Sequence, residues 1–544
     1  MNHSFIRSKP AILLVAVLAL AITLSLFNPG PSAAAPRSPQ TPDWAQRDPV
    51  TIITVNSGTD PDNSQSKTCT ANPTTCTLRR AIVEASNLGT EDLPVLIQFN
   101  IPADAANNYN ATLGIWKIPV LTTMDASVLP RMGGKITIDG YTQSGGTVIG
   151  PKIFLVGPGT GSKDGLVVGD IAGDNEIVIR GLAFQNFKTH MYVNTNNNLI
   201  EQNWFGLSDD GMEIYLRAAG VQDGSGNTGI SFNGSPSGNI VQTNVFAGLD
   251  GVAAALLGNA NTFNSNFIGT TYNGTVPEKQ TDPALICTPE DWLGGGGISV
   301  AGTNHIIRDN TFAGLRQHIS ATSLQPDAIR VSGSSGHTIQ DNWIGIDGED
   351  NVIGVCGRGI YLADGPKNVM VTGNWIINPG YSAISINGLL YDANTLRSNI
   401  IMNINGWPDL ENMSQAEDAI QVGKSLPLAF RNFQPAAITS IAGTEISGTS
   451  GAGSLCKLCN IEIFLDDIDD VAEALESLAV VTADSNGNWS ATLPYALGVG
   501  QALRTTTTTH QYNDIAGMSG GTTTGLSQLY LPAHWVFIPT VVKR

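Results

Sequence analysis

The side chains best suited to chemistry in this 544-residue chain lie in two short segments with similar patterns. Asp327 and Arg330 belong to the first segment, and Arg358, Tyr361 and Asp364 belong to the second. If the segments are equivalent parts of successive repeats, Asp327 lies against Arg358. Arg330 then lies against Tyr361. Carboxylates beside arginines suit acid–base cleavage of a sugar polymer. The candidate catalytic residues are Asp327, Arg330, Arg358 and Asp364. The alternative is an exposed Asp–Arg pair, which contributes little energy.

A second group of side chains suits binding rather than cleavage. Three carboxylates lie in the loop between the two segments, and a tryptophan lies in the long insertion 269–296, where an aromatic ring can stack on a sugar. With the tyrosine of the first group, the candidate ligand-binding residues are Tyr361, Trp292, Asp347, Glu349 and Asp350. Calcium is the candidate cofactor, through these carboxylates or the acidic run at 466–470, which is otherwise a solvated loop. We expect no other cofactor and no other metal.

The overall charge limits the classes of partner. With 28 Lys+Arg against 46 Asp+Glu, the net charge is −18, so there is no basic surplus for binding nucleic acid. The sequence has no H-E-x-x-H metal motif and no G-x-x-x-x-G-K-[ST] phosphate loop. We therefore favour a non-catalytic adhesion, envelope-structural or glycan-binding protein, whose partner is a polysaccharide or a cell-envelope component. The alternative is a polysaccharide lyase or glycoside hydrolase acting on acidic polysaccharide along a groove.

A repeat between about residues 165 and 405 predicts the fold. Corresponding short strands start at residues 229, 251, 297, 328, 359 and 383, which fits a unit near 22 residues with insertions. Such short strands bury their inward side chains only when successive coils stack about 4.8 Å apart. The prediction is an all-β, right-handed parallel β-helix with one interior column that contains Ile230, Ile298, Ile329 and Ile360. A β-propeller, the alternative, needs repeats of about 40 residues with hairpin turns.

Two further features belong to the predicted β-helix. Asn recurs at the turn after the second strand, where it tolerates a left-handed backbone and can bond to the Asn of the next coil. Residues 76–88 form an amphipathic pattern with Leu78, Ile82 and Ala85 on one face and Thr77 as a candidate N-cap. We expect this helix to cover the first coil. Alternating strands near the C-terminus predict a small β-sandwich after the β-helix.

The segments of the chain follow from these patterns. Arg7 and Lys9 precede an apolar run and a small-residue stretch, which together predict an export signal; an uncleaved membrane anchor is the alternative. We expect a secreted or cell-surface protein, with no transmembrane span in the mature chain and a monomeric state. The predicted segments are a signal peptide (1–35), a Pro-rich linker (36–49), an N-terminal cap and first coils (50–150), a β-helix (151–430), an immunoglobulin-like β-sandwich (435–528) and an apolar tail (529–544).

Six cysteines fit an oxidising compartment. The sequence alone allows fifteen pairings. Two pairs are close along the chain, whereas Cys287 and Cys356 are far apart, in two separate inserted loops. The expected disulfides are Cys69–Cys76, Cys456–Cys459 and Cys287–Cys356.

The helical segment resembles the Cys-Ser-Leu-Arg-Glu-Ala-Ile signature that opens many secreted bacterial β-helix proteins. This sequence has Thr77 in place of Ser and Arg80 in place of Glu. Residues 54–57 and 136–143 support the resemblance, as do the turns at 198–206 and 261–270. It spans roughly residues 50–430 and implies the β-helix fold and an extracellular setting, without any catalytic assignment. The strands near the C-terminus resemble the immunoglobulin-like modules that follow such β-helices.

Overall fold

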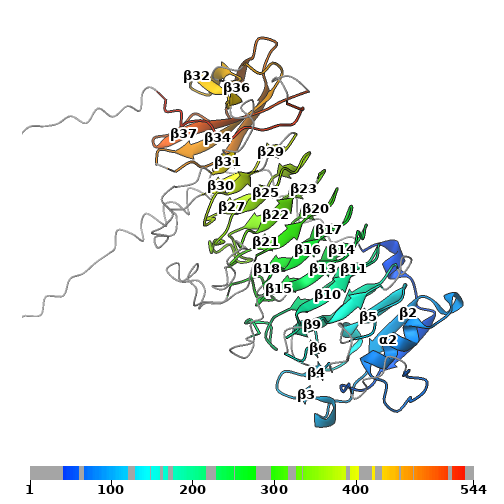
Figure 1. Cartoon of the computed structure of the whole chain (residues 1–544). Coiled ribbons are helices and arrows are strands. Elements are labelled where there is room, and N and C mark those ends of the chain that lie inside the picture. Colours follow the sequence, from blue (N-terminus) through cyan, green and yellow to red (C-terminus); the bar gives the residue numbers. More distant parts are fainter. Residues whose placement is uncertain are drawn as a thin grey trace, which may run out of the picture. The chain divides into compact units, whose positions relative to one another are not determined.

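The computed structural model shows the strands and helices of the described residues (Figure 1). It describes residues 41–60, 67–120, 129–146, 149–159, 163–169, 175–215, 228–249, 251–276, 296–315, 326–333, 335–387, 393–402, 419–422, 432–451, 455–469, 471–511 and 518–532. The predicted signal peptide, Trp292, Cys287 and the end of the apolar tail lie outside these residues. Among the described residues, no helix is long and apolar enough to cross a membrane.

Three sheets of stacked parallel strands form a right-handed parallel β-helix, which confirms the predicted fold class. Each full coil contributes one strand to sheet A, one to sheet B and one to sheet C, in chain order, and Figure 1 shows the coils following one another from blue to yellow. Among the described strands of these three sheets, the first pair in sheet B, β3 and β4, is antiparallel and the others are parallel.

The strands of sheet A are β1 (Thr51–Val55), β2 (Val95–Phe99), β5 (Ile136–Asp139), β8 (Val178–Arg180), β11 (Leu199–Glu201), β14 (Ile240–Gln242), β17 (Thr262–Asn264), β20 (Ile306–Arg308), β23 (Thr338–Gln340), β26 (Met370–Thr372) and β29 (Thr395–Arg397). The strands of sheet B are β3 (Tyr109–Asn110), β4 (Ile115–Pro119), β6 (Ile153–Val156), β9 (Leu182–Gln185), β12 (Trp204–Phe205), β15 (Val245–Phe246), β18 (Phe267–Ile268), β21 (Thr311–Phe312), β24 (Trp343–Ile344), β27 (Trp375–Ile377) and β30 (Ile400–Met402). The strands of sheet C are β7 (Leu166–Val168), β10 (Thr189–Val193), β13 (Thr228–Phe232), β16 (Ala254–Leu256), β19 (Ile298–Val300), β22 (Ile329–Ser332), β25 (Ile360–Ala363), β28 (Ile384–Ile386) and β31 (Ile420–Val422).

The predicted interior column lies on sheet C. Ile298, Ile329 and Ile360 occupy one register position on successive strands, and Ala254 lies between Ile298 and Ile230 in the same column. All of these side chains are buried. Because a fully buried Ile side chain contributes about 2 kcal/mol relative to an exposed one, the column is a main source of stability.

A ladder of buried asparagines runs along the turn between sheets A and B. Each Asn of this ladder except the last donates its backbone N–H to Oδ1 of the Asn in the next coil, as predicted. The members are Asn203, Asn244, Asn266, Asn310, Asn342, Asn374 and Asn399. The expected left-handed backbone, however, belongs to the preceding residue in each turn, for example Gln202, Thr243 and Asp341. The prediction placed it one residue too late, because the chain bends from sheet A into sheet B at the residue before the Asn, and the Asn side chain then bonds along the ladder.

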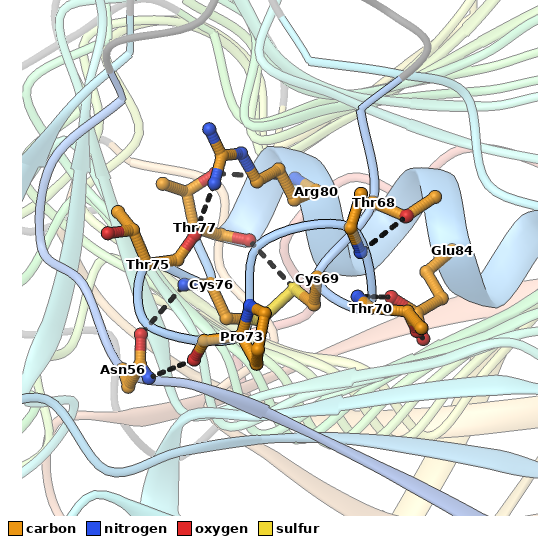
Figure 2. The surroundings of a disulfide bond; sticks show 11 residues. Asn56, Thr68, Cys69, Thr70, Pro73, Thr75, Cys76, Thr77, Arg80 and Glu84 are labelled. Carbon is orange, nitrogen blue, oxygen red and sulfur yellow. Dashed lines mark hydrogen bonds between the residues drawn. A yellow bond between two sulfur atoms is a disulfide. The ribbon is translucent and has the colours of Figure 1, made fainter.

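The N-terminal end of the β-helix is covered by helix α2 (Leu78–Ser86), as predicted. Thr77 caps the helix by accepting the backbone N–H of Arg80. The disulfide Cys69–Cys76 holds the loop before the helix, and Glu84 on the helix accepts from the backbone and hydroxyl of Thr70 in that loop (Figure 2). The other helices in the described part of the chain are short 3₁₀ turns: η1 (Asp43–Gln46), η2 (Thr90–Asp92), η3 (Ala105–Asn107) and η4 (Gly140–Thr142).

The C-terminal strands form the small β-sandwich that the sequence predicts. One sheet contains β32 (Ala437–Ala442), β33 (Glu445–Thr449) and β36 (Asn488–Thr492); the other contains β35 (Glu476–Thr482), β34 (Asn460–Asp467) and β37 (Gln501–Thr508). The sandwich contacts the last coil directly, because Ile401 of β30 pairs with Ala474. The disulfide Cys456–Cys459 is confirmed, and Cys356 is also disulfide-bonded.

Candidate ligand-binding site

Four of the predicted site residues lie together at the N-terminal ends of two neighbouring strands of sheet C, β22 and β25. Arg330 and Tyr361 are the outward-facing residues of β22 and β25 and are direct neighbours in the register, as the repeat spacing predicts. Their chain neighbours Ile329 and Ile360 point into the core, so the alternation of a β-strand forces both polar side chains outward. Asp327 and Arg358 precede these strands by two residues. We call Asp327, Arg330, Arg358, Tyr361 and Tyr381 the arginine cluster.

Asp327 is the buried centre of the arginine cluster. Its side chain is 1% exposed, and its Oδ1 accepts the backbone N–H of Arg358 at 3.0 Å. Arg358 Nη1 lies 3.6 Å from Oδ1, and Arg330 Nη1 lies 3.8 Å from Oδ2. Burial raises the pKa of Asp327, and the hydrogen bond from Arg358 and the two guanidinium groups partly oppose that rise. The carboxylate therefore serves as an internal counter-ion.

The two arginines differ in their accessibility. The guanidinium of Arg358 lies 4.4 Å from the ring centroid of Tyr361 and 5.2 Å from that of Tyr381, and its side chain is 14% exposed. Arg330 lies 4.9 Å from the Tyr361 ring, and its side chain is 34% exposed. Cation–π contacts of this kind contribute about 0.5–1 kcal/mol at exposed sites and more where water is excluded. Arg358 is thus held in place, whereas Arg330 presents its charge to solvent.

Small side chains precede and follow Arg330 and Tyr361 along the register on the outer face of sheet C, where both residues are partly exposed. The register neighbours of Arg330 on the preceding strands are Ser299, Ala255 and Ser231, and Tyr361 is followed by Ser385. Arg330 and Tyr361 therefore stand above a flat stretch of sheet. A flat face that carries one planar cation and one aromatic ring can lie along an extended polymer.

The other candidate residues do not join the arginine cluster. Asp364 is exposed, in a left-handed turn beyond the far end of β25. Asp347 is buried, and its carboxylate accepts from the backbone and side-chain amides of Asn351, so it stabilises its own loop. Glu349 and Asp350 are exposed in that loop. Their predicted roles in catalysis and binding stay predictions.

Two aromatic features at the surface were missed by the sequence analysis. Tyr381 joins the arginine cluster from the turn before β28. It precedes that strand by three residues, whereas Asp327 and Arg358 precede theirs by two. Trp343 and Trp375 stack on the outside of sheet B, with ring centroids 5.4 Å apart and planes 9° apart, and Trp375 is 40% exposed. The signal was present in the repeat, because Trp343 and Trp375 both directly follow a ladder Asn and pair in the register.

The acidic run in the sandwich is partly buried rather than fully solvated. Oxygens of Asp466, Asp467 and Glu473 lie within 4.8 Å of one another, which is close enough to share a cation. Arg504 already pairs with Asp466, however, and supplies positive charge at this point. The charge of Asp466 is therefore already balanced by Arg504, and the geometry alone does not favour a calcium ion at these carboxylates.

No protein-family model and no curated protein matches the sequence. Similar solved structures include a tailspike protein mutant of E. coli bacteriophage HK620 in complex with a pentasaccharide (11% identity, TM-score 0.35, covering 80% of this chain and 91% of that chain). The Azotobacter vinelandii mannuronan C-5 epimerase AlgE6 A-module also matches (12% identity, TM-score 0.31, 64% and 94% covered). So does the enzymatically active domain of bacteriophage CBA120 tailspike protein 2 (9% identity, TM-score 0.27, 82% and 73% covered). These similarities are too weak to transfer a function.

Proposed function

We propose that this protein is a secreted or cell-surface β-helix that binds a polysaccharide without cleaving it, in an adhesive or envelope-structural role. The observation that carries the proposal is the pair Arg330 and Tyr361, partly exposed on the outer face of sheet C, with Asp327 and Arg358 beside them. Guanidinium donors and an aromatic ring are the groups that proteins use to orient sugars.

Binding is favoured over cleavage by the position of the carboxylates. A glycoside hydrolase needs two carboxyl groups on either side of the scissile bond, roughly 5–10 Å apart. Asp327, the described carboxylate that pairs with both arginines, has a side chain only 1% exposed, so a polymer on the surface does not reach it. Asp364 lies beyond the opposite end of its strand.

The first test measures binding of the purified full chain to a panel of neutral and acidic polysaccharides by affinity electrophoresis. We expect R330A to weaken binding of the preferred polymer by about tenfold or more, since a charge-assisted contact is lost. The matched control is R308A, which removes an outward arginine from neighbouring sheet A. Equal binding by R330A and the parent protein would contradict the proposal; loss of binding in W375A instead would move the site to sheet B.

The second test addresses the enzyme alternative. The same polysaccharides are incubated with the protein, with and without calcium, and assayed for reducing ends and for unsaturated sugars. We expect neither product. Their release by the parent protein, but not by D327N or R330A, would replace the binding proposal with a lyase or hydrolase that uses the arginine cluster.

A further inference from the structure

The arginine cluster contains a carboxylate oxygen whose bonding is incomplete. Oδ2 of Asp327 is buried and has no hydrogen-bond partner among the described residues. Its nearest described cation is Arg330 Nη1, at 3.8 Å, which is beyond hydrogen-bond distance. Oδ1, in contrast, accepts the backbone N–H of Arg358. Asp327 is therefore hydrogen-bonded to the backbone of Arg358, while the guanidinium groups of Arg358 and Arg330 lie at ion-pair distances of 3.6 Å and 3.8 Å from its two oxygens.

The charges of the cluster leave Arg330 able to take a second anion. Two arginines and one aspartate give this patch a net positive charge on a chain whose total charge is −18. Arg358 contacts two tyrosine rings, and its side chain is 14% exposed, so its guanidinium is less available to a second anion than that of Arg330. Arg330 is a third exposed and presents several N–H donors in a planar fork.

We infer that Arg330 binds an anionic substituent of an acidic sugar, and that Asp327 competes with this substituent for the Arg330 guanidinium. The inference rests on the proposed function, and it adds the ligand class and the residue that limits the affinity. Asp327 does not touch the ligand. It acts through Arg330, because an internal counter-ion lowers the positive potential that an incoming anion meets.

Two substitutions change this competition in opposite directions. D327N keeps Oδ1, the atom that accepts from Arg358, and puts an amide NH2 group in place of the oxygen that has no hydrogen-bond partner. It removes the competing charge. S299D adds a charge instead, because Ser299 is the outward neighbour of Arg330 on β19. The Ser299 side chain is partly exposed, so the added carboxylate does not have to be buried in the core.

The experiment compares the full-length parent, D327N, S299D and R330Q on polygalacturonate, dextran sulfate and neutral dextran, with thermal unfolding as a check on folding. We expect D327N to bind the acidic polymers about 3- to 10-fold more tightly and S299D to bind them about 3- to 10-fold more weakly. R330Q should lose the preference for acidic polymers over dextran. Tighter binding of polygalacturonate identifies the ligand group as a carboxylate, and tighter binding of dextran sulfate identifies it as a sulfate.

The outcomes separate this inference from the proposed function. If R330Q abolishes acidic binding while D327N and S299D bind like the parent, Arg330 is a binding residue but Asp327 does not compete, and the inference fails alone. If D327N changes the affinity for neutral dextran as much as for the acidic polymers, Asp327 has only a structural role. If R330Q binds every polymer as the parent does, the proposed site itself is wrong.

Discussion

At several turns of this β-helix, one buried side-chain atom accepts the backbone N–H of the neighbouring coil. Along the turn between sheets C and A, Asn198, Asn239 and Asn261 form a second buried ladder. His305 and His337 continue it: Nδ1 of His305 accepts the N–H of Asn261, and Nδ1 of His337 accepts the N–H of His305. The two rings are stacked, with centroids 5.2 Å apart. Both imidazoles must be neutral to accept these bonds.

This requirement predicts a loss of stability in mild acid. Burial, together with the neighbouring His305, lowers the pKa of His337 from 6.5 to about 4. Between these values the unfolded chain binds a proton that the folded chain does not, so the free energy of unfolding falls as pH decreases from about 6.5 to about 4. The loss from His337 is about 3 kcal/mol at most.

The measurement is the midpoint of thermal unfolding between pH 4 and pH 7 for the parent and H337N. Asn occupies the equivalent position in earlier coils, at Asn239 and Asn261, and does not titrate, so H337N should flatten the profile. A control, H510N, replaces an exposed histidine and should not change it. An unchanged profile in H337N would show that other groups control acid stability.

At the scale of the structural element, each coil depends on buried amides as much as on apolar side chains. Asn342 shows this well. Its Oδ1 accepts the backbone and side-chain N–H groups of Asn310, and its Nδ2 donates to Asn374 and to two backbone carbonyls. One side chain thus satisfies polar groups in three successive coils, in a place that water does not reach.

Replacing Asn342 should therefore cost more than an apolar truncation of similar size. In N342A the buried N–H groups of Asn310 lose their acceptor, and we expect unfolding in urea to show a loss of about 2–4 kcal/mol. The control is T338A, an outward residue of the same coil, which should change stability by less than about 0.5 kcal/mol. Equal effects of the two substitutions would mean that the ladder contributes no net stability.

At the scale of the whole chain, the open ends of the β-helix must be covered, because unpaired strand edges invite aggregation. Helix α2 covers the first coil, and the sandwich contacts the last one. Glu462 of β34 is buried, accepts the backbone N–H of Ser398 at 3.0 Å and accepts the hydroxyl of Ser477. Burial raises the pKa of this carboxyl group, and these hydrogen bonds partly oppose the rise. The contact joins the two folding units.

We expect E462A to loosen this contact without unfolding either unit. The expected result is faster amide hydrogen exchange in β29 and β30 and a lower unfolding midpoint, while the exchange of the central coils is unchanged. E445A, an exposed residue of the sandwich, is the matched control. Unchanged exchange in E462A would show that the apolar contacts around Ile401 and Ala474 are sufficient.

The amino-acid sequence by itself determined the coil. Alternating side chains and repeated Asn are local properties of a strand and a turn, so spacing alone predicted the interior isoleucine column and the register of Arg330 against Tyr361. The cap helix and two disulfides could be predicted for the same reason, since their partners are close along the chain. Only the tertiary structure decided that Asp327 is buried, that Tyr381 joins its cluster and that Glu462 connects the sandwich to the last coil. Those contacts depend on the paths of irregular turns and on the packing of distant segments, and no local periodicity encodes either.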